Sequence, residues 1–177
     1  MELVWKEADC TIELNGTTLC AAPKDHAPFS FQAIVEEQDT QLLLSEQTIL
    51  TDPGKPAWYL AYTLEQQATH SLGEVLIRGQ TPKRLLAIIH DIEQSPTSTP
   101  DTVKRAYENI LTIIVENNIA SLALPLLGTV HGKLTLAESL RLLGSALELN
   151  PPSCLQRIWL ILPKETNCTC LSLQTLL

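Results

Sequence analysis

The chain has 177 residues, of which 45% are hydrophobic and 18% are charged. This length and composition are typical of one folded domain and exclude a disordered chain. The formal net charge is −8 and the lysines and arginines form no cluster, which argues against a nucleic-acid-binding surface. An anionic ligand would therefore have to be held mainly by backbone N–H groups.

The first residues are acidic, with Glu2, Glu7 and Asp9 where a signal peptide would have basic and apolar segments. The apolar runs are too short to cross a bilayer. Five cysteines, an odd number, are typical of free thiols in a reducing compartment. Cys168 and Cys170 lack a second pair of ligands at the usual spacing, so no metal site is predicted. We expect a cytoplasmic protein without membrane contact.

The N-terminal region is expected to form strands and one helix. Asn15 and Gly16 are a strong turn signal between β-type residues and predict an edge hairpin. Pro56 is well placed at the first position of a helix. The expected segments are strands 3–5 and 10–20, loop 21–28, strands 29–36 and 41–50 around a polar connection 37–40, turn 51–56 and helix 57–69.

The second half alternates regularly between strands and helices. Thr99 and Pro100 begin one helix as cap and first residue, and Thr135 with Glu138 forms a capping box for the next. The expected segments are strands 74–78 and 84–92, a helix from 100 to about 118, strand 121–127, helix 136–149 and strand 154–162. This alternation implies right-handed crossovers and a sheet covered on both faces. We predict a three-layer α/β/α fold with a mixed, largely parallel central sheet.

The loop between strand 121–127 and its helix is the main candidate site. It consists of Gly128, Thr129, Val130, His131 and Gly132. A strand that enters a helix through such a loop directs successive N–H groups and a helix dipole to one place, which suits a phosphate. The alternative is that the two glycines only allow the chain to turn.

Three aromatic or histidine side chains are further candidates. His131 could be a general acid or base, or an exposed loop residue without a role. His90 ends an apolar strand and is interpreted as a core histidine with satisfied hydrogen bonds. Trp58 could stack on an adenine, although packing is the default for a tryptophan. Separately, Glu36, Glu37 and Asp39 could pair for acid–base chemistry, but a solvated charged loop is the favoured interpretation.

Between residues 71 and 162 the sequence resembles the macrodomains. The matching segments are, in order, SLGEVLIRG, RLLAIIHDIE, AYENIL, SLALPLLGTVHGKLT and RIWLIL. The resemblance implies a macrodomain-like fold and assigns the loop from Gly128 to Gly132 to the diphosphate of ADP-ribose. It also implies a single domain over residues 1–177, in which residues 1–70 are divergent, residues 71–163 are family-like and residues 164–177 form a tail.

The sequence also departs from the family pattern. Macrodomains that bind ADP-ribose usually carry an Asn-Ala-Ala-Asn-type segment and a Gly-Gly-rich loop, whereas this chain has Glu36 to Asp39 and no Gly-Gly pair there. Glu36 thus takes a position where the family contacts a ribose. Val130 and Lys133 stand where the family tends to have glycine, and a β-branched residue adopts positive φ poorly. These changes argue against hydrolysis.

Three hypotheses about function follow. The first is a divergent module that binds ADP-ribose or a related nucleotide diphosphate through the loop from Gly128 to Gly132, with weak or no catalysis and without a cofactor. The second is a macrodomain-like scaffold with a structural or protein-interaction role, including homodimerisation. The third is a hydrolase that acts on ADP-ribosylated protein or on a phosphorylated ADP-ribose derivative. We favour the first, because Gly128, Thr129 and Gly132 are retained.

Overall fold

The structure is a computed structural model that describes residues 11–44 and 69–163. These residues form seven strands and two helices. The strands are β1 (Thr11–Leu14), β2 (Thr17–Pro23), β3 (Ala33–Asp39), β4 (Val75–Arg78), β5 (Lys83–His90), β6 (Ser121–Pro125) and β7 (Arg157–Leu162). The helices are α2 (Pro100–Glu116) and α3 (Leu136–Leu149).

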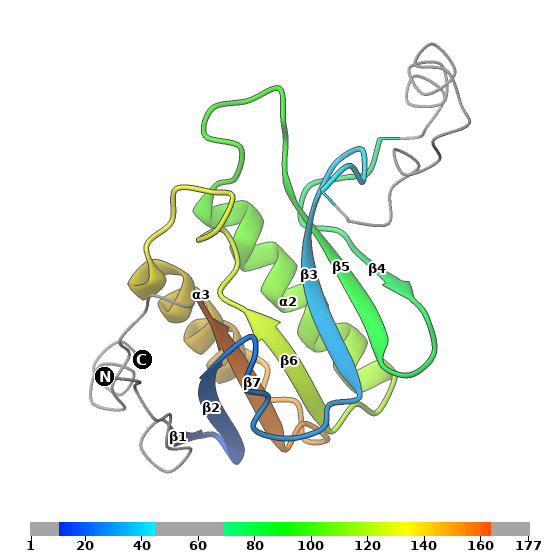
Figure 1. The fold of residues 1–177 in the computed structure, drawn as a ribbon, viewed down its shortest axis with the longest axis vertical. Helices are drawn as coiled ribbons and strands as arrows, with labels where there is room; N and C mark the ends of the chain where they lie inside the picture. The colour runs from blue at the N-terminus through cyan, green and yellow to red at the C-terminus, as the bar shows by residue number, and fades with distance from the viewer. Residues whose placement is uncertain (1–10, 45–68, 164–177) are drawn as a thin grey trace.

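The strands build one mixed sheet in the order β1-β2-β7-β6-β3-β5-β4. All neighbouring pairs between β2 and β5 in this order are parallel, whereas the edge strands β1 and β4 are antiparallel to their neighbours. The predicted mixed, largely parallel α/β fold is therefore confirmed. In Figure 1 the carboxyl ends of the parallel strands meet at the top, where the loops that follow β5 and β6 also lie.

The predicted hairpin is present, because Asn15 and Gly16 both have positive φ and join β1 to β2. Three predictions nearby were wrong. Residues 21–23 belong to β2 rather than to a loop, and residues 37–39, expected as a polar connection, complete β3. Residues 41–44, expected to begin a strand, form a turn and a bend.

Both helices begin as predicted. Thr99 caps α2 by accepting a hydrogen bond from the Thr102 N–H, and Thr135 and Glu138 form the reciprocal capping box of α3. The two helices pack against each other on one face of the sheet (Figure 1). The helix expected over 57–69 and strand 3–5 lie outside the described residues, and so does the tail. Among the described residues, no helix is long and apolar enough to span a bilayer.

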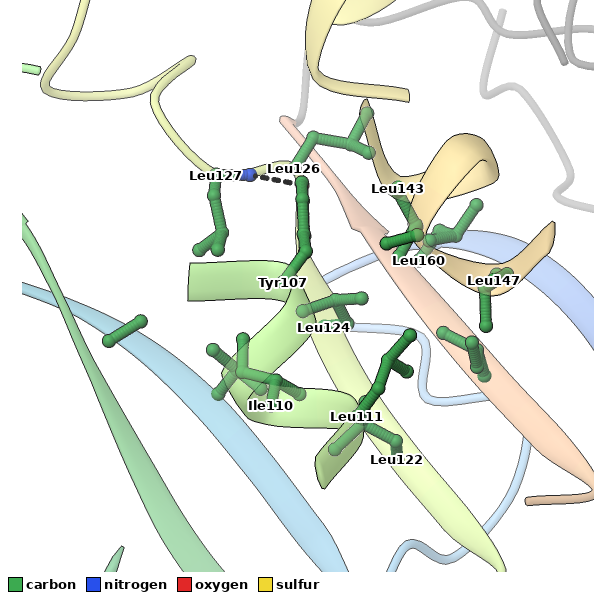
Figure 2. Packing of buried hydrophobic residues seen from close by; sticks show 14 of the residues in the cluster. Tyr107, Ile110, Leu111, Leu122, Leu124, Leu126, Leu127, Leu143, Leu147 and Leu160 are labelled. Carbon is green, nitrogen blue, oxygen red and sulfur yellow. Dashed lines mark hydrogen bonds between the residues drawn. The ribbon is translucent and has the colours of Figure 1, made fainter. Parts of the chain in front are cut away.

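Most of the core lies between the helices and the sheet. Figure 2 shows side chains from both helices meeting those of the central strands. Tyr107 adds a polar connection inside this core. Its hydroxyl accepts the Leu127 N–H at 2.9 Å and lies 2.8 Å from the Ser139 hydroxyl, which donates to the Leu127 carbonyl at 2.8 Å. Burial raises the pKa of Tyr107. The start of the loop after β6 is thus held by both helices.

Candidate functional site

A cleft opens at the carboxyl ends of the parallel strands, where α/β sheets usually bind their ligands. Its volume is about 610 Å³. It is bordered by the end of β3, by the loop after β6 and by residues at the ends of β2 and β7. Thr129, Val130 and His131 of the predicted loop line it. Of the five predicted loop residues, these three border the cleft, whereas Gly128 and Gly132 do not line it.

At both glycines of the loop, an added side chain would crowd neighbouring atoms. Gly128 has φ +78°, and an added Cβ would lie 3.1 Å from Val103. An added Cβ at Gly132 would lie 2.3 Å from the Ser98 hydroxyl oxygen and 2.4 Å from the Gly128 carbonyl oxygen. The Leu134 N–H closes the loop by donating to the Gly128 carbonyl at 3.2 Å. The glycines therefore allow the loop to fold tightly on itself.

Three consecutive backbone donors of the loop are unused. The N–H groups of Val130, His131 and Gly132 have no acceptor in the described part of the chain. Val130 and His131 are exposed, and the Val130 residue is 62% exposed. Val130 does not have positive φ, so the strain expected of a β-branched residue in that conformation is not present. Successive free N–H groups of this kind can bind an anion.

The first donor of the loop is already occupied. The Gly128 N–H donates to a carboxylate oxygen of Glu37 at 2.7 Å, and the other Glu37 oxygen lies 2.9 Å from Nε2 of His90. The side chains of Glu37 and His90 are only 6% and 1% exposed. The interpretation of Glu37 as belonging to a solvated loop was wrong, because β3 continues to Asp39 and carries Glu37 into the interior.

His90 is a buried histidine with partners on both ring nitrogens, as expected. Its Nδ1 lies 3.2 Å from the Thr97 hydroxyl, which in turn donates to the His131 carbonyl at 3.3 Å. The rings of His90 and His131 meet edge to face with centroids 5.9 Å apart. His90 therefore connects the end of β5, the end of β3 and the loop after β6.

Asp39 also has an internal role. Its carboxylate is completely buried and accepts the N–H groups of Gln41, Leu43 and Leu44 at 2.7, 2.8 and 2.9 Å. Leu42 within this turn has φ +60°. The expectation of a solvated loop was wrong for Asp39 as well. The carboxylate binds the turn donors in the segment where the family resemblance places a Gly-Gly-rich loop.

Glu36 borders the cleft but already has a cationic partner. Its carboxylate forms a two-pronged ion pair with the Arg84 guanidinium, with an Nε–Oε1 distance of 2.8 Å. Lys24 contributes a second cation to the border of the cleft. The contact of Glu36 with a base or ribose stays a prediction. Trp58 lies outside the described residues.

Gln38 is the unexpected residue of this site. It borders the cleft, its side chain is fully buried, and neither its amide nitrogen nor its amide oxygen has a hydrogen-bond partner in the described part of the chain. Buried polar groups are normally paired, and an unpaired one is destabilising. Alternation along β3 places Gln38 on the face opposite to the buried Ala33 and Val35, so the sequence pattern gave no signal that its side chain is enclosed.

We predict that Gln38→Leu raises the free energy of unfolding by about 1–2 kcal/mol, since it removes two unpaired polar atoms at nearly constant volume. Urea denaturation of the parent and the variant measures this change. Gln156→Leu, at an exposed position, is the matched control and should have little effect. A clear loss of stability in Gln38→Leu would show that the amide has a partner and would contradict the prediction.

Other residues of the motifs hold the fold together. The Asn109 side-chain amide donates to the Gly73 carbonyl at 2.7 Å, and Gly73 has φ +88° with an added Cβ position only 2.5 Å from Arg105. The Ser121 hydroxyl accepts the Gln32 N–H at 3.1 Å. The residues that carry the resemblance therefore mainly position strands and loops. No group of three metal-ligating side chains occurs in residues 11–44 and 69–163.

Comparison with known families agrees with this arrangement. The family model of the macro domain matches residues 56–143, about half of the chain. The chain belongs to the macro domain family. It is a divergent member, because solved macrodomains resemble it in fold at low sequence identity. The resemblance inferred from the motifs is confirmed.

Two solved macrodomains illustrate the likeness. A mutant of the Oceanobacillus iheyensis macrodomain is 18% identical, with a TM-score of 0.64 over 95% of this chain and 97% of its own. The macrodomain of Thermus aquaticus DarG is 20% identical, with a TM-score of 0.59 over 84% of this chain and 100% of its own. Another mutant of the Oceanobacillus protein, solved with ADPR, is 16% identical with a TM-score of 0.62 over 88% and 91% of the two chains. No curated protein matches the chain in sequence.

Proposed function

We propose that this macro domain binds ADP-ribose or a related nucleotide in its cleft, with weak or no catalysis. The observation that carries the proposal is the row of three unused N–H groups from Val130 to Gly132, of which Val130 and His131 border the cleft. Phosphate oxygens are suitable acceptors for such a row. Thr129, whose hydroxyl donates to the Leu126 carbonyl at 2.6 Å, supports the loop rather than the ligand.

The rest of the cleft fits the other portions of a nucleotide. Its volume of about 610 Å³ lies within the usual range for small-molecule sites. Ile34, Ile161 and Pro163 provide an apolar border against which a base can lie. The Oceanobacillus iheyensis macrodomain has been solved with ADPR and with ADP, which makes these ligands the first to test.

The carboxylates at the cleft do not favour hydrolysis. A general base needs a free oxygen within reach of a water or substrate. Glu37 binds the Gly128 N–H and approaches His90, Glu36 pairs with Arg84, and Asp39 caps the following turn. Among the described site residues, His131 is the only exposed one with an acid–base side chain, and it has no carboxylate partner in that part of the chain. We therefore propose binding rather than turnover.

A second candidate function is that of a scaffold with a protein partner or a second copy of the chain. One observation favours it: the first donor of the loop is satisfied by Glu37 instead of being left for a ligand. We also propose that residues 1–177 form a single domain, because β2 and β3 of the N-terminal region pair with β5, β6 and β7.

Calorimetric titration with ADP-ribose tests the proposal. Val130→Glu adds a negative charge beside the three donors at an exposed position and should preserve the fold. Val115→Glu makes the same change on α2, at a residue that is 56% exposed and does not border the cleft, and is the matched control. We expect micromolar binding by the parent and the control, and at least about tenfold weaker binding by Val130→Glu.

Two outcomes would contradict binding at this loop. The first is equal affinity of all three proteins, which would place the ligand elsewhere. The second is the absence of heat and of any thermal shift with a folded parent, which would favour the scaffold.

A further inference from the structure

We propose that Glu37 limits the charge of the ligand, so that the cleft prefers a nucleotide with one phosphate over a nucleoside diphosphate. This inference rests on the proposed function, because it concerns the same loop. Glu37 presents an oxygen to a backbone donor in the same way as a bound phosphate would. The Glu37 carboxylate thus occupies a backbone donor that a phosphate oxygen of the ligand could otherwise use.

The geometry supports this role. The Gly128 N–H to Glu37 distance of 2.7 Å is that of a charge-assisted hydrogen bond. Gly128 precedes the three free donors by only one intervening residue, so a second phosphate beside an anion on Val130 to Gly132 would approach Glu37. Adjacent like charges are strongly unfavourable at a desolvated site.

Glu37 cannot easily move away to admit the second phosphate. Its backbone lies in β3 opposite Ala87 of β5, in the interior of the sheet. The His90 ring holds the other carboxylate oxygen at 2.9 Å, and His90 is fixed by Thr97 on its far side. A ligand that displaced the carboxylate would have to break both contacts and leave Glu37 buried without them.

Arg84 borders the cleft but does not offset the negative charge of Glu37. Arg84 is paired with Glu36, which faces away from the helices like its neighbours Ile34 and Gln38. Glu37 lies on the opposite face of β3 and approaches the loop from the side of the helices. The charge next to the three free donors is therefore set by Glu37 together with His90.

The test compares adenosine, AMP, ADP and ADP-ribose by calorimetry. Glu37→Gln keeps the size of the side chain and an oxygen for the Gly128 N–H, and it removes one negative charge whatever the charge of His90. Glu116→Gln removes the same charge at an exposed position at the end of α2 and is the control.

We expect the parent and Glu116→Gln to bind AMP at least as tightly as ADP. In Glu37→Gln, the affinity for ADP and ADP-ribose should rise by about tenfold, with little change for adenosine. Binding of ADP by Glu37→Gln alone would also support the role of Glu37, while it would contradict nucleotide binding by the parent.

The inference is overturned if the parent prefers ADP to AMP, or if a folded Glu37→Gln leaves the AMP-to-ADP ratio of the parent unchanged. The ratio in the parent needs no variant, so it decides the question even if Glu37→Gln does not fold. If none of the four compounds binds to the folded parent or the folded variant, the proposed function itself fails, and this result is distinct from a reversed AMP-to-ADP preference.

Discussion

Replacing His90 by leucine is expected to lower the free energy of unfolding by about 3 kcal/mol, because it removes a hydrogen-bond partner of the buried Glu37 carboxylate and leaves that oxygen without a described donor. The substitution leaves the Glu37 carboxylate enclosed, with the Gly128 N–H as its remaining described donor. It also removes the contact with Thr97 that joins β5 to the loop after β6. Urea denaturation of the parent and the variant measures the loss.

A second substitution separates the effect of the charge from the loss of packing. Glu37→Gln in the His90→Leu background removes the uncompensated carboxylate and keeps an acceptor for Gly128. The double variant should therefore be more stable than His90→Leu alone, because the two residues are in direct contact and their effects are not additive. Strict additivity of the two substitutions would contradict the coupling that the 2.9 Å contact implies.

Replacing Gly132 by alanine is expected to lower the free energy of unfolding by about 1–3 kcal/mol and to weaken nucleotide binding by at least about tenfold. The new methyl group would overlap the Ser98 hydroxyl and the Gly128 carbonyl, which lie 2.3 and 2.4 Å from its position. The Gly128 carbonyl belongs to the backbone and already accepts the Leu134 N–H, so it cannot move freely. Denaturation and titration with ADP-ribose measure the two effects.

Lys133→Ala is the control for Gly132→Ala, because Lys133 is the exposed next residue and an alanine there meets no clash from an added methyl group. It should leave stability nearly unchanged. If Gly132→Ala were as stable as the parent and bound the ligand equally well, the loop would have to relax around the methyl group, and its tight closure would not matter for binding.

The turns, the helix starts and the strand that leads into the loop could be predicted from the sequence. Asn15 and Gly16, Thr99 with Pro100, and the Thr135–Glu138 pair act through hydrogen bonds and φ values within a few residues, so their effect is local. The order of the macrodomain-like segments and the loop from Gly128 to Gly132 could likewise be recognised in the sequence. Several residues of those segments proved to hold strands and loops of the fold together, namely Gly73, His90, Tyr107, Asn109 and Ser121.

The end of β3 could not be predicted in the same way. A run of Glu, Glu, Gln and Asp has the composition of a solvated turn, and nothing local to it indicates otherwise. Pairing with β5 places this run in a strand. Hydrogen-bond partners from distant segments compensate the cost of burying the Glu37 carboxylate. Those partners, Gly128 and His90 for Glu37, are 91 and 53 residues away.

The sequence by itself therefore determined the fold class, the family resemblance and the position of the loop, because these depend on periodicity, caps and turn residues along the chain. Only the tertiary structure decided which donors of that loop remain free. Glu37 accepts the Gly128 N–H and the Leu126 carbonyl accepts the Thr129 N–H, whereas no described group accepts the N–H groups of Val130, His131 and Gly132. The physical reason is that hydrogen-bond satisfaction at a strand end depends on which segments the sheet brings together.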